Sequence, residues 1–323
     1  MVSESSLLPV LCLLGPTASG KTDIAIQLVD RFAFEIVNVD SAQVYRQMDI
    51  GTAKPDADVL RQAPHALIDI VDPWQQYSVA MFLQDADTEI SRIHAQGKIP
   101  LLVGGTMLYF RALWHGLSNL PKSDPEVRDR LCEYASVHGQ DALYSRLQKI
   151  DPESAARIHS NDPQRILRAL EVYELSGQTL SGLQNQKARA NSYHFYNIGL
   201  FPQDRKQLHE RIAARFLKML AAGFENEVRT LMELPQMNSM LPSMRCVGYR
   251  QMWQYLSGEI NETELQDRGV AATRQLAKRQ ITWLRGMDNC QLIDPFGESD
   301  SLGDQFLNES LLAWIETQQE HLL

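Results

Sequence analysis

A glycine-rich octapeptide near the start of the chain has the residue types needed to bind phosphate groups. It fits the pattern G-x-x-x-x-G-K-[ST] throughout, with Gly15, Pro16, Thr17, Ala18, Ser19, Gly20, Lys21 and Thr22. The glycines let successive backbone N–H groups turn toward phosphate oxygens, the lysine adds a positive charge, and the threonine hydroxyl is a ligand for Mg²⁺. We therefore expect this segment, called the phosphate loop, to hold a diphosphate group, with Thr22 as the metal contact.

The phosphate loop leaves the identity of the phosphate compound open. An apolar run precedes it and an amphipathic segment follows it, which is the strand-to-helix setting that the pattern requires and which disfavours an inert surface turn. ATP is the usual ligand of such loops. A nucleoside or small-molecule kinase is therefore one function that the residues allow.

Asp40 is a second residue that could take part in chemistry, because it follows the apolar run Glu35–Val39. Open α/β sheets expose their ligands at the carboxyl ends of the strands. A carboxylate there could bind Mg²⁺ through water, or accept a proton from a hydroxyl or amine nucleophile. It could also simply cap the turn that follows. The residues nearest to Asp40 do not decide between these roles.

The elements that must position these residues predict an α/β fold: a P-loop core whose parallel sheet is flanked by helices, plus an all-helical insert. After the phosphate loop, Ile24, Leu28 and Phe32 recur at helical spacing and predict a helix. The apolar runs expected to form strands are Pro9–Leu14, Glu35–Val39, Ala66–Val71, Ile99–Val103, Phe195–Leu200 and Gln291–Ile293.

Residues 121–190 have a different composition and predict the helical insert. They contain the pairs Asp124-Pro125, Asp151-Pro152 and Asp162-Pro163, and a capping aspartate followed by proline is typical of a helix start. Gly177 suits a helix end, and the polar stretch Gln184–Ser192 is expected to close the insert. The catalytic core is then discontinuous and consists of residues 1–120 and 191–323.

Composition limits the classes of function. The formal net charge is −9, so nucleic-acid binding would have to depend on local basic patches rather than on bulk charge. No apolar run approaches the roughly 20 residues of a membrane helix. The four cysteines form no CxxC pair, which argues against a structural zinc site and fits a reducing compartment. We expect a cytoplasmic protein without a membrane segment.

Several local basic clusters do occur. The stretch Arg268–Arg285 holds five basic residues and no acidic one, and Arg274, Lys278 and Arg285 share one helical face. Gln164, Arg165 and Arg168 cluster similarly in the insert. Taken singly, each cluster is more typical of a solvated helix face than of an RNA site.

Six further segments, read together with the phosphate loop, resemble one family. They are Val39–Tyr45, Met48–Pro55, Leu102–Tyr109, Asn161–Arg165, Arg245–Gln251 and Thr273–Gln280. In this order, spanning about residues 9 to 286, the set resembles the tRNA dimethylallyltransferases, also called tRNA isopentenyltransferases. The eukaryotic C-terminal zinc-finger extension has no counterpart in the sequence, so the resemblance is to the bacterial form.

The resemblance implies transfer of a dimethylallyl group from dimethylallyl diphosphate to N6 of the adenosine immediately 3′ of the anticodon, with release of diphosphate. It implies Mg²⁺ as cofactor and the tRNA anticodon stem-loop as partner; we expect no obligate protein partner, and a monomer. By position, Asp40 matches the acceptor of the N6 proton, Thr106 a residue near the target nucleotide's phosphate, and Arg215 an arginine that neutralises the leaving diphosphate. From the residues alone, Arg215 would instead be expected to pair with Glu210 or Glu225.

The target adenine sits in a stacked anticodon loop, so we expect it to flip out of the stack toward residues 40–43. Because basic segments occur in both the core and the insert, we also expect residues 121–190 to clasp the stem-loop. The expected tRNA-binding residues are Asp40, Ser41, Ala42, Gln43, Thr106, Arg128, Gln164, Arg165, Ile166, Leu167, Arg168, Arg245, Cys246, Val247, Gly248, Tyr249, Arg250, Arg274, Lys278, Arg279 and Arg285.

Three alternatives stay open beside this interpretation. One is the kinase, another is an adenylate isopentenyltransferase acting on a free nucleotide, and the third is a non-enzymatic RNA-binding module. The insert and the basic C-terminal helix exceed what a free nucleotide needs, and a binding module gives no reason for a complete phosphate loop.

Overall fold

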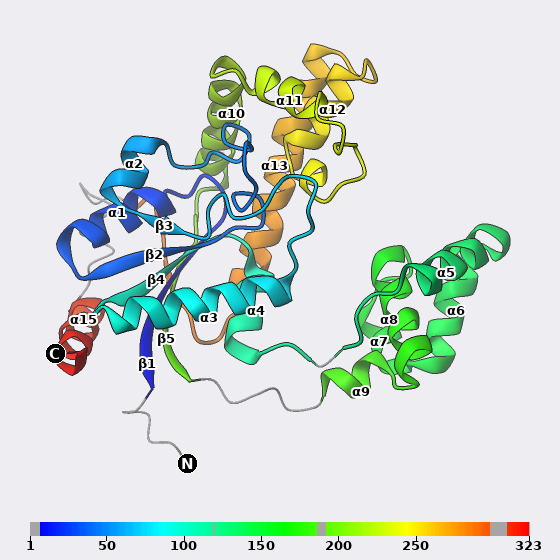
Figure 1. The fold of residues 1–323 in the computed structure, drawn as a ribbon, viewed down its shortest axis with the longest axis horizontal. Helices are drawn as coiled ribbons and strands as arrows, with labels where there is room; N and C mark the ends of the chain where they lie inside the picture. The colour runs from blue at the N-terminus through cyan, green and yellow to red at the C-terminus, as the bar shows by residue number, and fades with distance from the viewer. Residues whose placement is uncertain (1–6, 119, 186–191, 298–308, 323) are drawn as a thin grey trace. The chain divides into compact units, whose positions relative to one another are not determined.

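The computed structural model describes residues 7–118, 120–185, 192–297 and 309–322 (Figure 1). The chain divides into two compact units, a core unit of residues 1–114 and 192–323 and an insert unit of residues 115–191. The insert unit thus begins a few residues before the expected boundary at 121. In the described part of the chain no helix is long and apolar enough to cross a membrane.

A parallel sheet forms the centre of the core unit. Its strands follow the order β3-β2-β4-β1-β5-β6, and each neighbouring pair is parallel. The strands are β1 (Leu8–Leu14), β2 (Phe34–Val39), β3 (His65–Ala66), β4 (Ile99–Gly104), β5 (Tyr193–Leu200) and β6 (Gln291–Ile293). The predicted α/β class with a parallel sheet is confirmed.

One predicted strand was wrong in its extent. The run Ala66–Val71 was expected to be extended, but β3 ends at Ala66. Leu67 and Asp69 take left-handed backbone conformations, with φ of 64° and 56°, so the chain turns out of the sheet. Val71 returns only to an isolated bridge with Tyr45. Hydrophobicity predicted the burial of this run but not its turns.

Helices cover both faces of the sheet. On one face, Phe82 and Ile90 of α3 (Val79–Ala95) and Phe110 of α4 (Met107–His115) pack in the same cluster as strand residues. On the other face, Ile24 and Leu28 of α1 (Lys21–Arg31) pack with α15 (Glu309–Leu322). Burying each of these side chains contributes about 1.5–3 kcal/mol, which fixes the ends of the strands in place.

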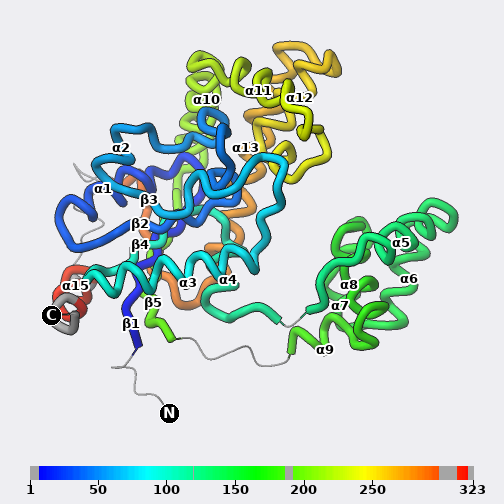
Figure 2. Tube along the Cα trace, in the orientation of Figure 1, coloured from blue at the N-terminus to red at the C-terminus, as the bar shows by residue number. Residues whose placement is uncertain are grey.

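A third hydrophobic cluster joins the segment after β2 to the C-terminal helices. Figure 2 shows the backbone of this segment running beside those helices. Met48 packs in this cluster with Phe224 and Tyr249. The helices are α10 (Arg205–Ala221), α11 (Phe224–Met232), α12 (Tyr249–Leu256) and α13 (Glu262–Arg285), and the short α2 (Ala57–Gln62) follows the segment itself. Residues distant in sequence therefore meet beyond the carboxyl end of the sheet.

The insert unit is helical in its described residues, as predicted. Its helices are α5 (Pro125–His138), α6 (Gln140–Ile150), α7 (Pro152–Arg157), α8 (Pro163–Ser176) and α9 (Leu180–Gln184). Asp124, Asp151 and Asp162 each cap a helix that begins with proline, and Gly177 ends α8 with φ of 68°. The expected closing loop lies mostly outside the described residues, which stop at 185 and resume at 192.

Asp151 is the most strongly bonded of the three caps. It is 2% exposed and accepts hydrogen bonds from Ser154 N, Ser181 N and Ser181 Oγ at 2.9, 2.9 and 2.6 Å. Burial alone would raise its pKa, but these bonds from Ser154 and Ser181 outweigh it and hold the pKa below the usual value. The carboxylate thus links α7 to α9.

We predict that Asp151→Asn lowers the stability of the insert unit by about 2–3 kcal/mol, because the charged acceptor is lost at a buried site. Amide exchange in α7 and α9 measures the loss at neutral pH. Asp162→Asn is the matched control, since Asp162 caps α8 through Arg165 N and is less buried; it should cost about 1 kcal/mol or less. Because the pKa of Asp151 is lower in the folded protein than in the unfolded chain, its carboxylate stabilises the fold at pH values above the unfolded pKa. This stabilisation is lost as the pH falls through the folded-state pKa, so the stability deficit of Asp151→Asn should shrink in acid. Equal losses in both variants would contradict the role given to Asp151.

Candidate active site in the core unit

A cavity of about 540 Å³ lies in the core unit at the carboxyl ends of β1, β2 and β4. Its walls come from the phosphate loop, residues 40–43, residues 51–55, the turn after β4, and helices α10 and α13. Ligands of open α/β sheets bind at this edge. Asp40, Thr106 and Arg215, which the sequence placed far apart, all line it.

The phosphate loop joins β1 to α1, as its motif predicted. Ala18 and Gly20 have φ of 64° and 92°, and Ser19 Oγ donates to Pro16 O at 2.8 Å, which closes the turn. Gly20 has no side chain to cap α1. The first N–H groups of that helix are therefore available to an anion.

Two cations lie beside this loop. Lys21 Nζ donates to the carbonyl oxygens of Gly15 and Pro16 at 3.0 and 2.8 Å. Desolvation first, and then the nearby Arg215, lower the pKa of Lys21 to about 7, while Asp40 opposes the shift. Desolvation also lowers the pKa of Arg215. Lys21 and Arg215 are thus two partly desolvated cations, and Asp40 is the one carboxylate that interacts with both of them. This excess of positive charge favours binding of an anion.

Asp40 follows β2 and lines the cavity. Its Oδ1 accepts from Ala42 N and Gln43 N at 2.8 and 3.3 Å. Asp40 therefore does cap the following turn, as one reading of the sequence proposed. This use of Oδ1 does not conflict with a role in proton transfer, because a carboxylate has a second oxygen.

Thr106 holds the turn that carries Asp40. Its N–H donates to Val39 O at 3.2 Å, and its Oγ1 accepts from Ser41 N at 3.1 Å. The ends of β2 and β4 approach closely because β4 ends in glycine: a Cβ at Gly104 would lie 2.0 Å from Val39 O. Thr106 thus links the two strand ends at the cavity.

Arg215 is turned toward the cavity rather than toward a surface carboxylate. The partners considered from sequence are engaged elsewhere, Glu210 with Lys206 and Glu225 with Arg229. Arg215 Nη2 instead donates to Thr52 O at 3.4 Å. Gln43 Nε2 donates to the carbonyl oxygens of Thr52 and Ala53, each at 3.2 Å.

Two residues of the cavity were missed by the sequence analysis. Gln280 is 8% exposed; its Oε1 accepts from Thr17 N and its Nε2 donates to Gly105 O, each at 2.9 Å. It thereby ties α13 to the phosphate loop and to the turn after β4. Asn38 is 5% exposed and its Nδ2 has no hydrogen-bond partner within the described residues. An asparagine two residues before Asp40 in an apolar strand, on the same face, was an available signal.

Helix α13 presents its basic residues on two sides. Arg279 and Gln280 line the cavity. Arg274, Lys278 and Arg285 lie on the opposite face, where they line a second groove of about 360 Å³ together with Arg205 and His209 of α10. The predicted sharing of one face is confirmed, but that face is not the wall of the cavity.

The segment Arg245–Arg250 is also divided. The cavity is lined by Arg245, Cys246, Val247 and Gly248. Arg250 does not line it and is exposed to solvent. Burial raises the pKa of Cys246 to about 12, with Asp40 adding to the shift, which favours the protonated thiol.

The side chain of Tyr249 lies in the interior of the core unit. This residue was expected to bind RNA, but its side chain is fully buried and its hydroxyl donates to Glu227 at 2.5 Å. Ile166 of the insert unit was also expected to bind RNA, and its side chain is fully buried among the helices of that unit. Both side chains belong to hydrophobic cores.

In the insert unit, the residues expected to contact RNA differ in their exposure and in their contacts within the protein. Arg168 pairs with the buried Glu171 at 2.8 Å and donates to Pro121 O at 2.7 Å, which is a structural use of the cation. Arg165 is exposed and lies 3.4 Å from Asp162. Gln164 is exposed, and Arg128 and Leu167 are half-buried.

Comparison with known proteins agrees with this architecture. The model of the family "IPP transferase" matches residues 43–287, and that of "Isopentenyl transferase" matches residues 8–69. Among solved structures, the tRNA isopentenylpyrophosphate transferase of Bacillus halodurans is 35% identical with a TM-score of 0.70, the match covering 97% of each chain.

Two further structures are similar over nearly the whole chain. The tRNA delta(2)-isopentenylpyrophosphate transferase of Staphylococcus epidermidis is 32% identical with a TM-score of 0.66, covering 96% of this chain and 99% of that one. A eukaryotic dimethylallyltransferase acting on tRNA is 27% identical with a TM-score of 0.76, covering 95% and 77%. With its phosphate loop, Asp40 and Arg215 around one cavity, this chain belongs to the IPP transferase family and is a tRNA prenyltransferase of the isopentenyl (dimethylallyl) type.

Proposed function

We propose that this protein transfers the dimethylallyl group of dimethylallyl diphosphate to N6 of the adenosine immediately 3′ of the anticodon in tRNA. The observation that carries the proposal is the convergence of the phosphate loop, Asp40 and Arg215 on one cavity. In the reaction, a bond forms between N6 and C1 of the dimethylallyl group, and the C1–O bond breaks. Its electron pair leaves with diphosphate.

The cations of the site stabilise the leaving group. The loop N–H groups and the N-terminus of α1 hold the diphosphate, and Lys21 and Arg215 offset the charge that grows on it as the C1–O bond breaks. Asn38 Nδ2, a buried donor in the cavity wall, adds a further hydrogen bond to the same anion. Fixed charges in a site shielded from water act more strongly than in solution.

Asp40 accepts the proton that N6 loses. An exocyclic adenine amine is a weak nucleophile and gains from a hydrogen-bonded base. Thr106 and Ser41 hold the turn around Asp40 and lie where the target nucleotide's phosphate would bind. Ala42 and Gln43 face the adenine edge. The adenine must leave its stack to reach this depth.

Mg²⁺ fits the donor set, with Thr22 Oγ1 as a protein ligand and the diphosphate as the other. In the described residues no group of three or more His, Cys, Asp or Glu side chains could hold a metal ion. This suits Mg²⁺, which keeps several waters and binds through substrate phosphates rather than in a protein cage. When bound, it would add positive charge at the leaving diphosphate.

RNA binding outside the cavity uses the exposed cations. The groove between α10 and α13 suits the phosphate backbone of the tRNA through Arg274, Lys278 and Arg285, while Arg245, Arg250 and Arg279 contact the nucleotides nearer the cavity. Residues 121–190 clasp the stem-loop through Arg128, Gln164 and Arg165. We also propose that the protein acts as a monomer in the cytoplasm.

A paired assay tests the reaction class. Purified protein is incubated with Mg²⁺, bulk tRNA and dimethylallyl diphosphate labelled in the prenyl group, and separately with γ-labelled ATP and nucleosides. We expect label in RNA in the first reaction alone. Phosphoryl transfer from ATP without labelling of RNA would show the protein to be a kinase.

Asp40→Asn should lower the single-turnover rate of prenyl transfer by about 10²–10⁴-fold, because the amide cannot accept the N6 proton. The affinity for dimethylallyl diphosphate, measured by calorimetry, should change little. An unimpaired rate would remove Asp40 from the role of base.

Lys21→Ala should weaken the binding of dimethylallyl diphosphate by about 10–100-fold, since it removes one charge-assisted hydrogen bond. Lys206→Ala, at an exposed position of α10, is the control and should bind the donor like the unmodified protein. Equal affinities of the two variants would show that the diphosphate binds elsewhere.

Removing Arg274 or Lys278 should weaken tRNA binding and reduce the slope of log affinity against log salt by about one per cation. Donor affinity should be unchanged, because these side chains lie on the face of α13 opposite the cavity. Filter binding at several salt concentrations measures the slope. A slope equal to that of Lys206→Ala would exclude the groove from the RNA interface.

A further inference from the structure

Residues 49–54 form a turn, and Gly51, Thr52 and Ala53 of this turn line the cavity. The carbonyl oxygens of Thr52 and Ala53 hold Gln43 Nε2, and Thr52 O also accepts from Arg215. The side chains of Gln43 and Arg215 therefore take their orientation from this turn. Contacts that hold the turn in place also hold these two side chains.

Glu227 of α11 fixes one side of the turn from outside the cavity. Its Oε2 accepts from Asp49 N and Ile50 N at 2.9 and 2.6 Å, and its Oε1 accepts from Gly51 N at 3.1 Å and from the Tyr249 hydroxyl at 2.5 Å. Three successive backbone N–H groups and one hydroxyl thus converge on a single carboxylate. Hydrogen bonds to a charged acceptor are shorter and stronger than neutral ones.

Close packing reinforces the same contact. A Cβ at Gly51 would lie 2.2 Å from Phe224 Cε2 and 2.6 Å from Tyr249 Cε2. Only glycine lets the turn approach α11 and α12 so closely. Glu227 therefore holds a segment that is also seated against two aromatic rings.

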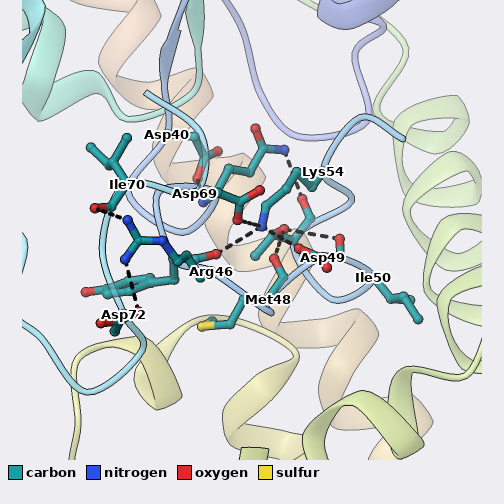
Figure 3. A network of polar contacts seen from close by, with 12 residues as sticks. Asp40, Arg46, Met48, Asp49, Ile50, Lys54, Asp69, Ile70 and Asp72 are labelled. Carbon is teal, nitrogen blue, oxygen red and sulfur yellow. Dashed lines mark hydrogen bonds and ion pairs between the residues drawn. The ribbon is translucent and has the colours of Figure 1, made fainter. Parts of the chain in front are cut away.

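Lys54 fixes the other side of the turn (Figure 3). Its side chain is 3% exposed, and Nζ donates to Tyr45 O at 2.9 Å and to Asp49 and Asp69 Oδ1, each at 2.5 Å. Between the two anchors, Ala53 is held in a left-handed conformation with φ of 49°. A non-glycine residue keeps that conformation only when its surroundings impose it.

We propose that Glu227 is a positioning residue for the reaction: by holding Asp49–Gly51 it orients the Gln43 amide toward the acceptor adenine. This rests on the proposed function of the cavity. Glu227 does not line the cavity, so it touches neither substrate and acts through the turn. Small errors in the placement of reacting groups lower rates steeply.

The variant Glu227→Gln removes the charge with little change in size. Glu225→Gln is the matched control, two residues away on α11, where Glu225 forms a partly exposed pair with Arg229. Two readouts are measured in each protein: amide exchange of Asp49, Ile50 and Gly51, and kcat and KM for prenyl transfer to an anticodon stem-loop. Affinity for inorganic diphosphate reports on the phosphate loop.

In Glu227→Gln we expect exchange of the three amides to rise by about tenfold or more, and kcat/KM for the stem-loop to fall by about 10–100-fold. Diphosphate affinity should stay within about threefold, because the loop and Lys21 are untouched. In a Gln43→Ala background, the further loss caused by Glu227→Gln should be much smaller than in the unmodified protein, since both changes act on one group.

Full activity despite faster exchange would overturn the proposal, as would unchanged exchange. Losses that multiply independently in the double variant would also overturn it, because Glu227 would then act by another route. If the unmodified protein fails to alkylate RNA, the proposed function fails. The exchange data still decide whether Glu227 holds the turn, so the two failures are distinguishable.

Discussion

The site depends on the placement of two partly desolvated cations, Lys21 and Arg215, beside a single carboxylate, Asp40. Lys21 comes from the start of α1, Arg215 from α10 and Asp40 from the end of β2. Removing Lys21 and Arg215 from water lowers their pKa values, and Asp40 only partly compensates. Such a site favours an anion with several oxygens. A leaving diphosphate, whose charge grows as its bond to carbon breaks, benefits most from it.

Buried polar side chains keep these groups in register. Gln280 links α13 to both the phosphate loop and Gly105, and Thr106 links the end of β4 to the turn after β2. The turn at residues 49–54 joins that assembly through carbonyl oxygens. Helix α13 thus connects the phosphate loop, which one of its faces contacts, to the groove on its other face, where we propose that RNA binds.

Much of this arrangement could be predicted from local signals in the sequence. The phosphate loop, the helices that begin with Asp-Pro and five of the strands follow from turn chemistry and periodicity. The short length of β3 could not be predicted in this way. The apolar run Ala66–Val71 is typical of a strand, but Leu67 and Asp69 turn the backbone out of the sheet. Side-chain roles set by distant partners were also hidden: Tyr249 faces Glu227, Ile166 faces the insert core, and Gln280 faces the phosphate loop. Composition cannot reveal which distant residue packs against a given side chain in the folded protein.

The central claim is that one cavity holds a prenyl diphosphate against an extruded adenine. Nucleoside mass spectrometry of an anticodon stem-loop RNA, after reaction with the purified protein and dimethylallyl diphosphate, tests it most directly. We expect the adenosine immediately 3′ of the anticodon to carry a dimethylallyl group (C5H9) in place of one N6 hydrogen, a net gain of C5H8, with one diphosphate released per modified nucleoside. Unmodified RNA, or a prenyl group on another position, would contradict it.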